Sequence, residues 1–225
     1  MFFEFRFWKN LFNQNDLMES LNNATMRHFE KRVWLVTFLG MLLYALRDIW
    51  GMHTEGLTTI FVNGYGDTYS VARIASLLGA IIWSILFMAF HFFGMAFLYH
   101  KITAVDLSKA AVLQLFVVAL LLMEKALIFF IFAIVGYTTD YSLLSFGPLA
   151  ATYIENEFFI YFFNQLTLIT ALIIAIQFQF LRAFTKMSAR NLFIILIAVQ
   201  IVLALISATF SVLPLQTWFE GGQLA

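Results

Sequence analysis

The chain has 225 residues, of which 62% are hydrophobic and only 12% charged, and its formal net charge is zero. A typical soluble domain carries about 25% charged residues, so this composition excludes an ordinary soluble protein and favours one that lies in a lipid bilayer. Cysteine is absent, which excludes disulfides, thiolate metal ligands and cysteine nucleophiles.

The first 32 residues carry bulky aromatic residues at helical spacing, with basic and polar residues between them. Phe5, Trp8 and Phe12 recur on one face, a pattern typical of a short helix that lies in the plane of the membrane interface. A helix that binds a partner protein is the alternative. We therefore expect residues 1–32 to form a cytoplasmic or interfacial amphipathic segment ahead of the membrane domain.

Five apolar runs follow along the chain. A helix that crosses a hydrocarbon core of about 30 Å needs roughly 20 apolar residues, and these runs meet or approach that length. They predict an all-α, polytopic membrane bundle of five transmembrane helices within residues 33–213, followed by a short outside tail at 214–225. The predicted spans are 33–50, 74–99, 110–135, 158–181 and 192–213.

Basic residues predict the orientation of these spans. Ten of the thirteen lysine and arginine residues lie in the N-terminal segment or in the loops after the second and fourth spans. Because cytoplasmic loops are enriched in basic residues, we expect a cytoplasmic N-terminus and an extracytoplasmic C-terminus. The composition favours the plasma membrane of a bacterium as the location.

Small residues recur every four positions along the second predicted span, and small residues let helices approach closely in lipid. Such a face suits packing within the chain, and it equally suits a homo-oligomer. One row contains Ala72, Ser76, Ala80 and Ser84, and the neighbouring row contains Ala75 and Gly79.

Glu124 and Lys125 are adjacent charged residues in the interior of the third predicted span. An ionisable group inside a membrane is costly and is by default a functional candidate. Consecutive helical side chains point about 100° apart, so each needs another partner, and Asn164 and Gln165 of the fourth span are the candidates. The pair can act as a proton or cation relay or as a polar clamp. We favour the clamp, because coupled transporters usually carry more than one intramembrane acid.

His91 and His100 lie nine residues apart on the second span, about half a helical rotation, so we expect them on opposite faces and not in one metal site. His91 is expected to be packed and hydrogen-bonded. The sequence contains no metalloprotease, hydrolase or nucleotide-loop motif. We therefore predict no enzyme activity, catalytic residue, metal, cofactor or nucleic-acid partner. His100 with Asp106 is the one hint of an enzyme acting on lipid.

Three segments carry a family pattern in addition to the apolar runs. They are the aromatic lead-in Phe7–Phe12, the inner loop His100–Lys109 and the segment Leu181–Arg190 before the last span. Together with the five spans, they resemble the bacterial branch of the Yip (Ypt-interacting protein) family of membrane proteins. The Asp-Leu-Tyr-Gly-Pro signature and long cytosolic N-terminal region of the eukaryotic members are absent. The resemblance implies a non-enzymatic membrane factor, and bacterial relatives can accompany ABC-type exporters as accessory proteins.

The sequence thus predicts a non-enzymatic integral membrane accessory or scaffolding protein that contacts the lipid bilayer and a membrane protein partner, with ABC exporter subunits as candidate partners. The alternative is a small transporter or channel subunit with ion coupling through Glu124.

Overall fold

The computed structural model of the protein describes residues 2–3, 7–23, 25–26, 28–52, 54–63, 66–136 and 141–213. The secondary structure of these residues is helical, apart from an isolated bridge and two strands of two residues each. The strands, β1 (Phe2–Phe3) and β2 (Thr25–Met26), pair in parallel. The all-α fold class is therefore confirmed for the described residues.

The chain divides into two compact units. The first comprises Met1–Thr138 and Ile176–Ala189, and the second comprises Thr139–Ala175 and Arg190–Ala225. The elements of the first unit are α1 (Phe7–Phe12), α2 (Gln14–Asn23), α3 (Phe29–Trp50), the 3-10 helix η1 (Glu55–Leu57), α4 (Thr58–Val62), α5 (Gly66–Ala89), the π-helical η2 (Phe90–Gly94), α6 (Met95–Thr103), α7 (Leu107–Val135) and the end of α10 (Leu168–Phe184). The elements of the second are α8 (Gly147–Tyr153), α9 (Glu157–Asn164), the start of α10 and α11 (Ala189–Val212).

Four helices of the described chain are long and apolar enough to cross a membrane, as a membrane protein requires. They are α3, the continuous helix Gly66–Thr103 made of α5, η2 and α6, then α7, and α11. These helices contain the first, second, third and fifth predicted spans almost entirely. The predicted outside tail at 214–225 lies beyond the described residues.

The fourth predicted span, 158–181, is wrong as a single helix. It is divided into α9 and α10, and α10 is a shorter apolar helix of 17 residues. The Thr167 hydroxyl accepts a hydrogen bond from the Thr170 backbone N–H at 3.0 Å, which starts α10 with an N-cap. The residues between the two helices are polar enough to end one helix and begin another.

At the break between α9 and α10, backbone groups form hydrogen bonds with an earlier segment of the chain. Residues 144–146 and 166–168 form an antiparallel bridge with hydrogen bonds of 3.2 and 3.1 Å. Irregular backbone is tolerated at membrane depth only where protein or water satisfies its polar groups. The break is therefore stabilised by hydrogen bonds within the second unit. In this unit α8 and α9 also pack against each other.

The first half of α7 is the core of the first unit. Every residue from Val112 to Val118 is buried, and Leu113 and Val118 have no exposed surface. A helix that is apolar on all sides must be buried on all sides. α3, α6 and η2 contact α7, and the ring of Phe7 on α1 stacks on that of Phe116 at 5.3 Å.

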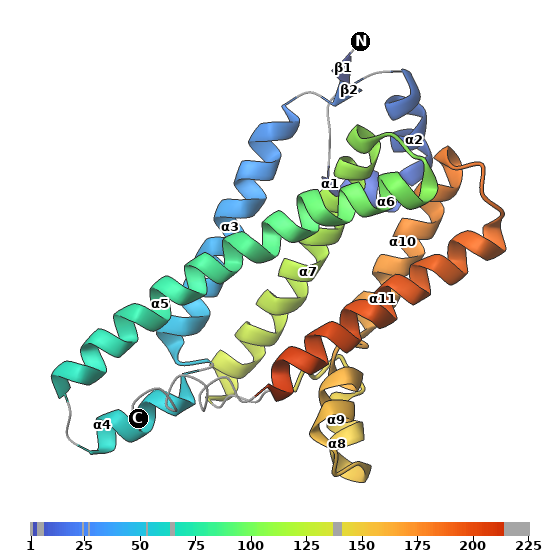
Figure 1. Cartoon of the computed structure of the whole chain (residues 1–225). Helices are drawn as coiled ribbons and strands as arrows, with labels where there is room; N and C mark the ends of the chain where they lie inside the picture. Colours follow the sequence, from blue (N-terminus) through green and yellow to red (C-terminus); the bar gives the residue numbers. More distant parts are fainter. Residues whose placement is uncertain are drawn as a thin grey trace, which may run out of the picture. The chain divides into compact units, whose positions relative to one another are not determined.

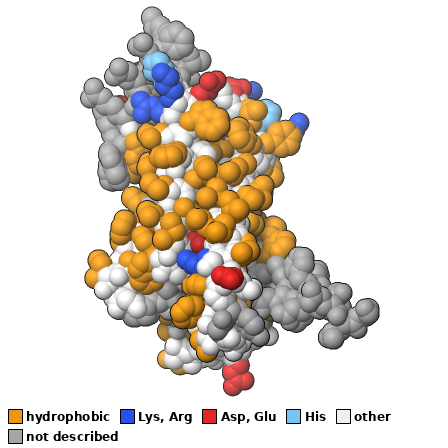
Figure 2. All heavy atoms as spheres, turned by 90° about the vertical axis from the view of Figure 1, so that its left-hand side faces the viewer, with side chains coloured by type: hydrophobic (Ala, Val, Ile, Leu, Met, Phe, Trp, Pro, Cys, Tyr) orange, Lys and Arg blue, Asp and Glu red, His pale blue; other side chains and the backbone are white. Residues whose placement is uncertain are grey.

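The outer faces of α3 and α5 carry exposed apolar side chains. Trp34 is 73% exposed and Phe93 of η2 is 71% exposed. Water-soluble proteins rarely expose large contiguous apolar patches of this kind. On the face that Figure 2 draws, hydrophobic side chains form a broad band, with charged side chains above it and others in its lower part. Such a band is suited to contact with lipid acyl chains.

Gly40 lets α3 approach α5 and α7 closely. A Cβ atom at this position would lie 2.6 Å from Met88 Sδ and 3.2 Å from Leu122 Cδ1. At the other end of α3, Gly51 adopts a left-handed conformation with φ of 108° and its N–H caps the helix, a role that favours glycine. Both glycines fix where α3 lies and where it stops.

Candidate functional site

Glu124 and Lys125 lie near the middle of α7, as the sequence predicts, in an unbroken helix. Glu124 is 8% exposed, and Lys125 is half-buried. The predicted interaction of this pair with Asn164 and Gln165 would join the two units, and it stays a prediction.

Two aromatic rings lie near the Lys125 ammonium. Its Nζ lies 5.9 Å from the ring centroid of Tyr44 on α3 and 5.5 Å from that of Phe87 on α5. The guanidinium of Arg47 lies 5.6 Å from the same Tyr44 centroid. A cation over a ring face is stabilised by about 0.5–2 kcal/mol, more where water is excluded. We call Tyr44, Arg47, Phe87, His91 and Lys125 the cation–aromatic cluster; it ties α3, α5 and α7 together.

His91 lies in the π-helical turn η2, against the same ring as Lys125. The His91 ring centroid is 4.5 Å from that of Phe87 and 5.4 Å from that of Phe90. The π turn is closed by the Met95 N–H, which bonds to Phe90 O five residues earlier. The prediction that His91 and His100 lie on opposite faces assumed 3.6 residues per turn, and the π turn between them departs from that value. π-helical turns inside α-helices are frequent at functional sites.

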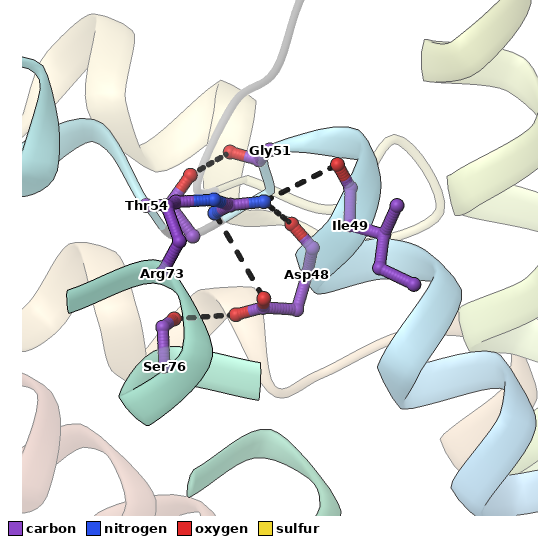
Figure 3. Close-up of polar contacts among 6 residues, drawn as sticks. All are labelled: Asp48, Ile49, Gly51, Thr54, Arg73 and Ser76. Atoms are coloured by element: carbon purple, nitrogen blue, oxygen red, sulfur yellow. Dashed lines mark hydrogen bonds and ion pairs between the residues drawn. The ribbon is translucent and has the colours of Figure 1, made fainter. Parts of the chain in front are cut away.

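A second polar site links the end of α3 to the start of α5 (Figure 3). Arg73 Nη2 donates to Asp48 O at 2.8 Å and to Ile49 O at 3.3 Å, and Arg73 Nη1 lies 3.8 Å from Asp48 Oδ1. Ser76 Oγ donates to Asp48 Oδ2 at 2.5 Å. Arg73 also neutralises the negative end of the α3 dipole. We call these three residues and their contacts the Asp48–Arg73–Ser76 network.

The predicted small-residue face separates into two rows with different surroundings. Ser84 is fully buried, and Ala72, Ser76 and Ala80 are half-buried. Because Ser76 bonds to Asp48 and these residues share one helical face, this row faces α3. Ala75 and Gly79 are exposed, and a Cβ at Gly79 would meet no atom within 4 Å. The Ala75–Gly79 row therefore lies outside the α3–α5 contact.

Asn164 and Gln165 lie at the break between α9 and α10. Asn164 Oδ1 accepts hydrogen bonds from Ser142 N and Ser145 Oγ, each at 2.8 Å, and Gln165 O accepts one from Thr170 Oγ1 at 3.1 Å. These groups hold the second unit in shape.

The remaining sequence candidates have local partners. His100 Nδ1 lies 2.7 Å from Val105 O, and Asp106 lies 3.7 Å from the Lys109 ammonium. Among the described residues no three histidine, aspartate or glutamate side chains gather as metal ligands would. The predicted aromatic face of Phe5, Trp8 and Phe12 lies outside the described side chains, so its interfacial role stays a prediction.

Comparison of the chain with protein-family models, with curated proteins and with solved structures finds no match. The resemblance to the Yip family therefore stays a prediction. Sequence reasoning missed two features of the site, the Asp48–Arg73–Ser76 network and the π turn. The network had a signal: Asp48 and Arg73 stand at facing ends of consecutive predicted spans, with Ser76 one turn further on. For the π turn we find no such signal.

Proposed function

We propose that this chain is a non-enzymatic accessory or scaffolding protein of a bacterial plasma membrane, with a cytoplasmic N-terminus. It acts by lateral contact with a larger membrane protein, and the family resemblance makes ABC exporter subunits the first candidates. The Ala75–Gly79 row supports this proposal. It is a small-residue surface in the middle of a long apolar helix, and the neighbouring helix of the same unit does not cover it.

The charged groups that lie within the helices are consistent with this role. Lys125 and Arg47 lie over aromatic rings, and Asp48 and Arg73 join two helices. Such contacts brace a bundle, and a rigid bundle presents a fixed lateral surface to a partner helix. Small residues on that surface allow close backbone approach, which is the main source of helix association in lipid.

Two substitutions on adjacent residues test the proposal. Gly79→Ile fills the exposed row and should abolish partner association while leaving thermal stability unchanged. Ala80→Ile puts the same side chain on the row that faces α3, and it should lower the melting temperature of the isolated protein. The measurement is a pull-down of tagged protein in mild detergent at native expression, with co-purifying proteins quantified by mass spectrometry. Undiminished recovery of exporter subunits with Gly79→Ile would contradict the proposal.

An ion-coupled transporter or channel subunit is the second candidate. The buried Glu124 and the contact between α7 and the π turn favour it, because intramembrane acids and π turns both occur at functional sites. Proteoliposomes containing a pH-sensitive dye and an imposed potassium diffusion potential would report proton flux. Loss of flux in Glu124→Gln with unchanged thermal stability would favour this candidate. Lower stability without any flux in the wild type would leave Glu124 as part of a structural clamp.

A further inference from the structure

Lys125 carries a positive charge in the interior of α7 without an acidic partner in the described part of the chain. Its contacts are the rings of Tyr44 and Phe87, and no ion pair or hydrogen bond joins its ammonium to another described residue. Glu124, the preceding residue, is buried and points about 100° away around the helix. Lys125 itself is only half-buried, and its Nζ reaches the surface of the protein. The charge is therefore open to a partner from outside the chain.

The depth of this ammonium is unfavourable for an unpaired charge. α7 ends at Val135, ten residues and about 15 Å beyond Lys125, and Tyr44 lies six residues and about 9 Å before the end of α3 at Trp50. Both helices are long and apolar enough to cross a hydrocarbon core of about 30 Å, and lipid phosphates lie outside this core. Ionisable groups at such depth pair with one another or with backbone carbonyls. A carboxylate that enters the membrane within a helix therefore matches this position better than a lipid phosphate does.

The Ala75–Gly79 row of α5 continues toward this ammonium. Ala75, Gly79, Trp83 and Phe87 follow one another every four residues along the helix, and side chains at this spacing form the ridge that packs against a neighbouring helix. Trp83 is 60% exposed, so the exposed part of the ridge extends past Gly79, and the next residue on the ridge is Phe87, which Lys125 contacts. A helix that packs along this ridge would therefore arrive at the Lys125 ammonium.

We propose that Lys125 forms an ion pair with an aspartate or glutamate in the interior of a transmembrane helix of the partner protein. That helix packs along the ridge from Ala75 to Phe87. The inference rests on the accessory role, and it adds the chemistry of the partner, an apolar span with one acidic residue near its middle. The rings of Tyr44 and Phe87 restrict the Lys125 side chain before the partner binds, so that less conformational entropy is lost when the ion pair forms.

Binding of a model transmembrane peptide to the full chain tests this pairing. The probe is a fluorescent polyleucine helix with one central glutamate, and resonance energy transfer to the labelled protein reports its binding in phosphatidylcholine vesicles. The wild type should bind this peptide about 5-fold to 30-fold more tightly than a matched peptide with glutamine, the range expected for one polar pair between helices in lipid. Lys125→Gln should abolish the preference, and the charge-conserving Lys125→Arg should retain it.

Lys101→Gln is the matched control. Lys101 also places its ammonium near a ring, 5.4 Å from the Phe97 centroid, but it is exposed on the last turn of α6. Its loss should leave the preference for the glutamate peptide unchanged. Thermal melting checks that each variant is folded, and the comparison of the two peptides on the wild type needs no variant. Equal affinity of the wild type for the two peptides would overturn the inference, as would an equal loss of preference in Lys101→Gln.

Native mass spectrometry with phosphatidylglycerol tests an anionic lipid as the source of the counter-charge. The wild type and Lys125→Gln should bind this lipid equally. A loss of bound lipid in Lys125→Gln would assign the ammonium to a lipid phosphate and contradict the pairing with a helix.

Co-purification separates this inference from the accessory role. Loss of exporter subunits from the pull-down with both Gly79→Ile and Lys125→Gln, in folded protein, would support both proposals. Loss with Gly79→Ile alone would keep the accessory role and rule out the ion pair. Undiminished recovery with both variants would count against both.

Discussion

At the scale of single residues, Asp48 joins two helices through one carboxylate. Asp48 is 6% exposed; its side chain accepts a hydrogen bond from the Ser76 hydroxyl and lies beside Arg73, and its backbone carbonyl accepts one from the same arginine. Burying a carboxylate is costly unless it is paired and hydrogen-bonded. Here Arg73 pairs with the carboxylate and the Ser76 hydroxyl hydrogen-bonds to one of its two oxygens, so Asp48 holds α3 against α5.

Asp48→Ala should lower the free energy of unfolding by about 2–3 kcal/mol, because it leaves the Arg73 guanidinium without its carboxylate. Ser76→Ala removes one hydrogen bond and should cost about 1 kcal/mol. Titration with SDS in mild detergent, followed by circular dichroism, measures both. Asp67→Ala is the control: Asp67 is exposed on the first turn of α5, so its loss should cost less than about 1 kcal/mol. Equal losses in all three variants would contradict a specific role for the network.

At the scale of helices, local pattern predicted five spans, of which four are long helices in the structure, and it failed at two irregular features. Apolar length alone located the first, second, third and fifth spans, because a membrane helix satisfies its own backbone. The division at 165–167 depends on a pairing with residues 144–146, which lie about 20 residues earlier and beyond any local pattern. Thr167 and Thr170 carried a weak capping signal. The π turn depends on packing around Phe90 and Gly94, which hydropathy does not report.

The contact between α8 and α9 gives the next prediction. A Cβ at Gly147 would lie 2.5 Å from Asn164 Oδ1 and 2.9 Å from Asn164 Cβ, and Asn164 cannot move without losing its bonds to Ser142 and Ser145. Gly147→Ala should therefore cost about 1–3 kcal/mol by overpacking. Gly66→Ala is its control, since a Cβ there meets nothing within 4 Å and the change should fall within about 0.5 kcal/mol. Equal melting temperatures for the two variants would argue against the tight α8–α9 contact.

At the scale of the whole molecule, the direction of α10 bears on how often the chain crosses the membrane. α7 begins at the basic end of the first unit, which carries Lys101 and Lys109, and Phe184 at the end of α10 lies against Lys109 at that same end. We therefore expect the chain that leaves this end through α7 to return to it along α10. At 17 residues α10 is about 25 Å long, somewhat less than a hydrocarbon core of about 30 Å. Snorkelling of Arg182 and local thinning of the bilayer can accommodate this difference.

This geometry predicts that α10 crosses the membrane as a fifth span. The chain has no cysteine, so a single introduced cysteine is the only target of a membrane-impermeant maleimide. Cysteines at the exposed positions Asp67 and Tyr153 should be labelled from outside intact cells, and those at Lys101 and Lys186 only after the membrane is permeabilised. Asp67 and Lys101 lie at opposite ends of one long helix and calibrate the two sides. Labelling of Tyr153 and Lys186 from the same side would mean that α10 does not cross, and the basic end would then have to be reached without a fifth span.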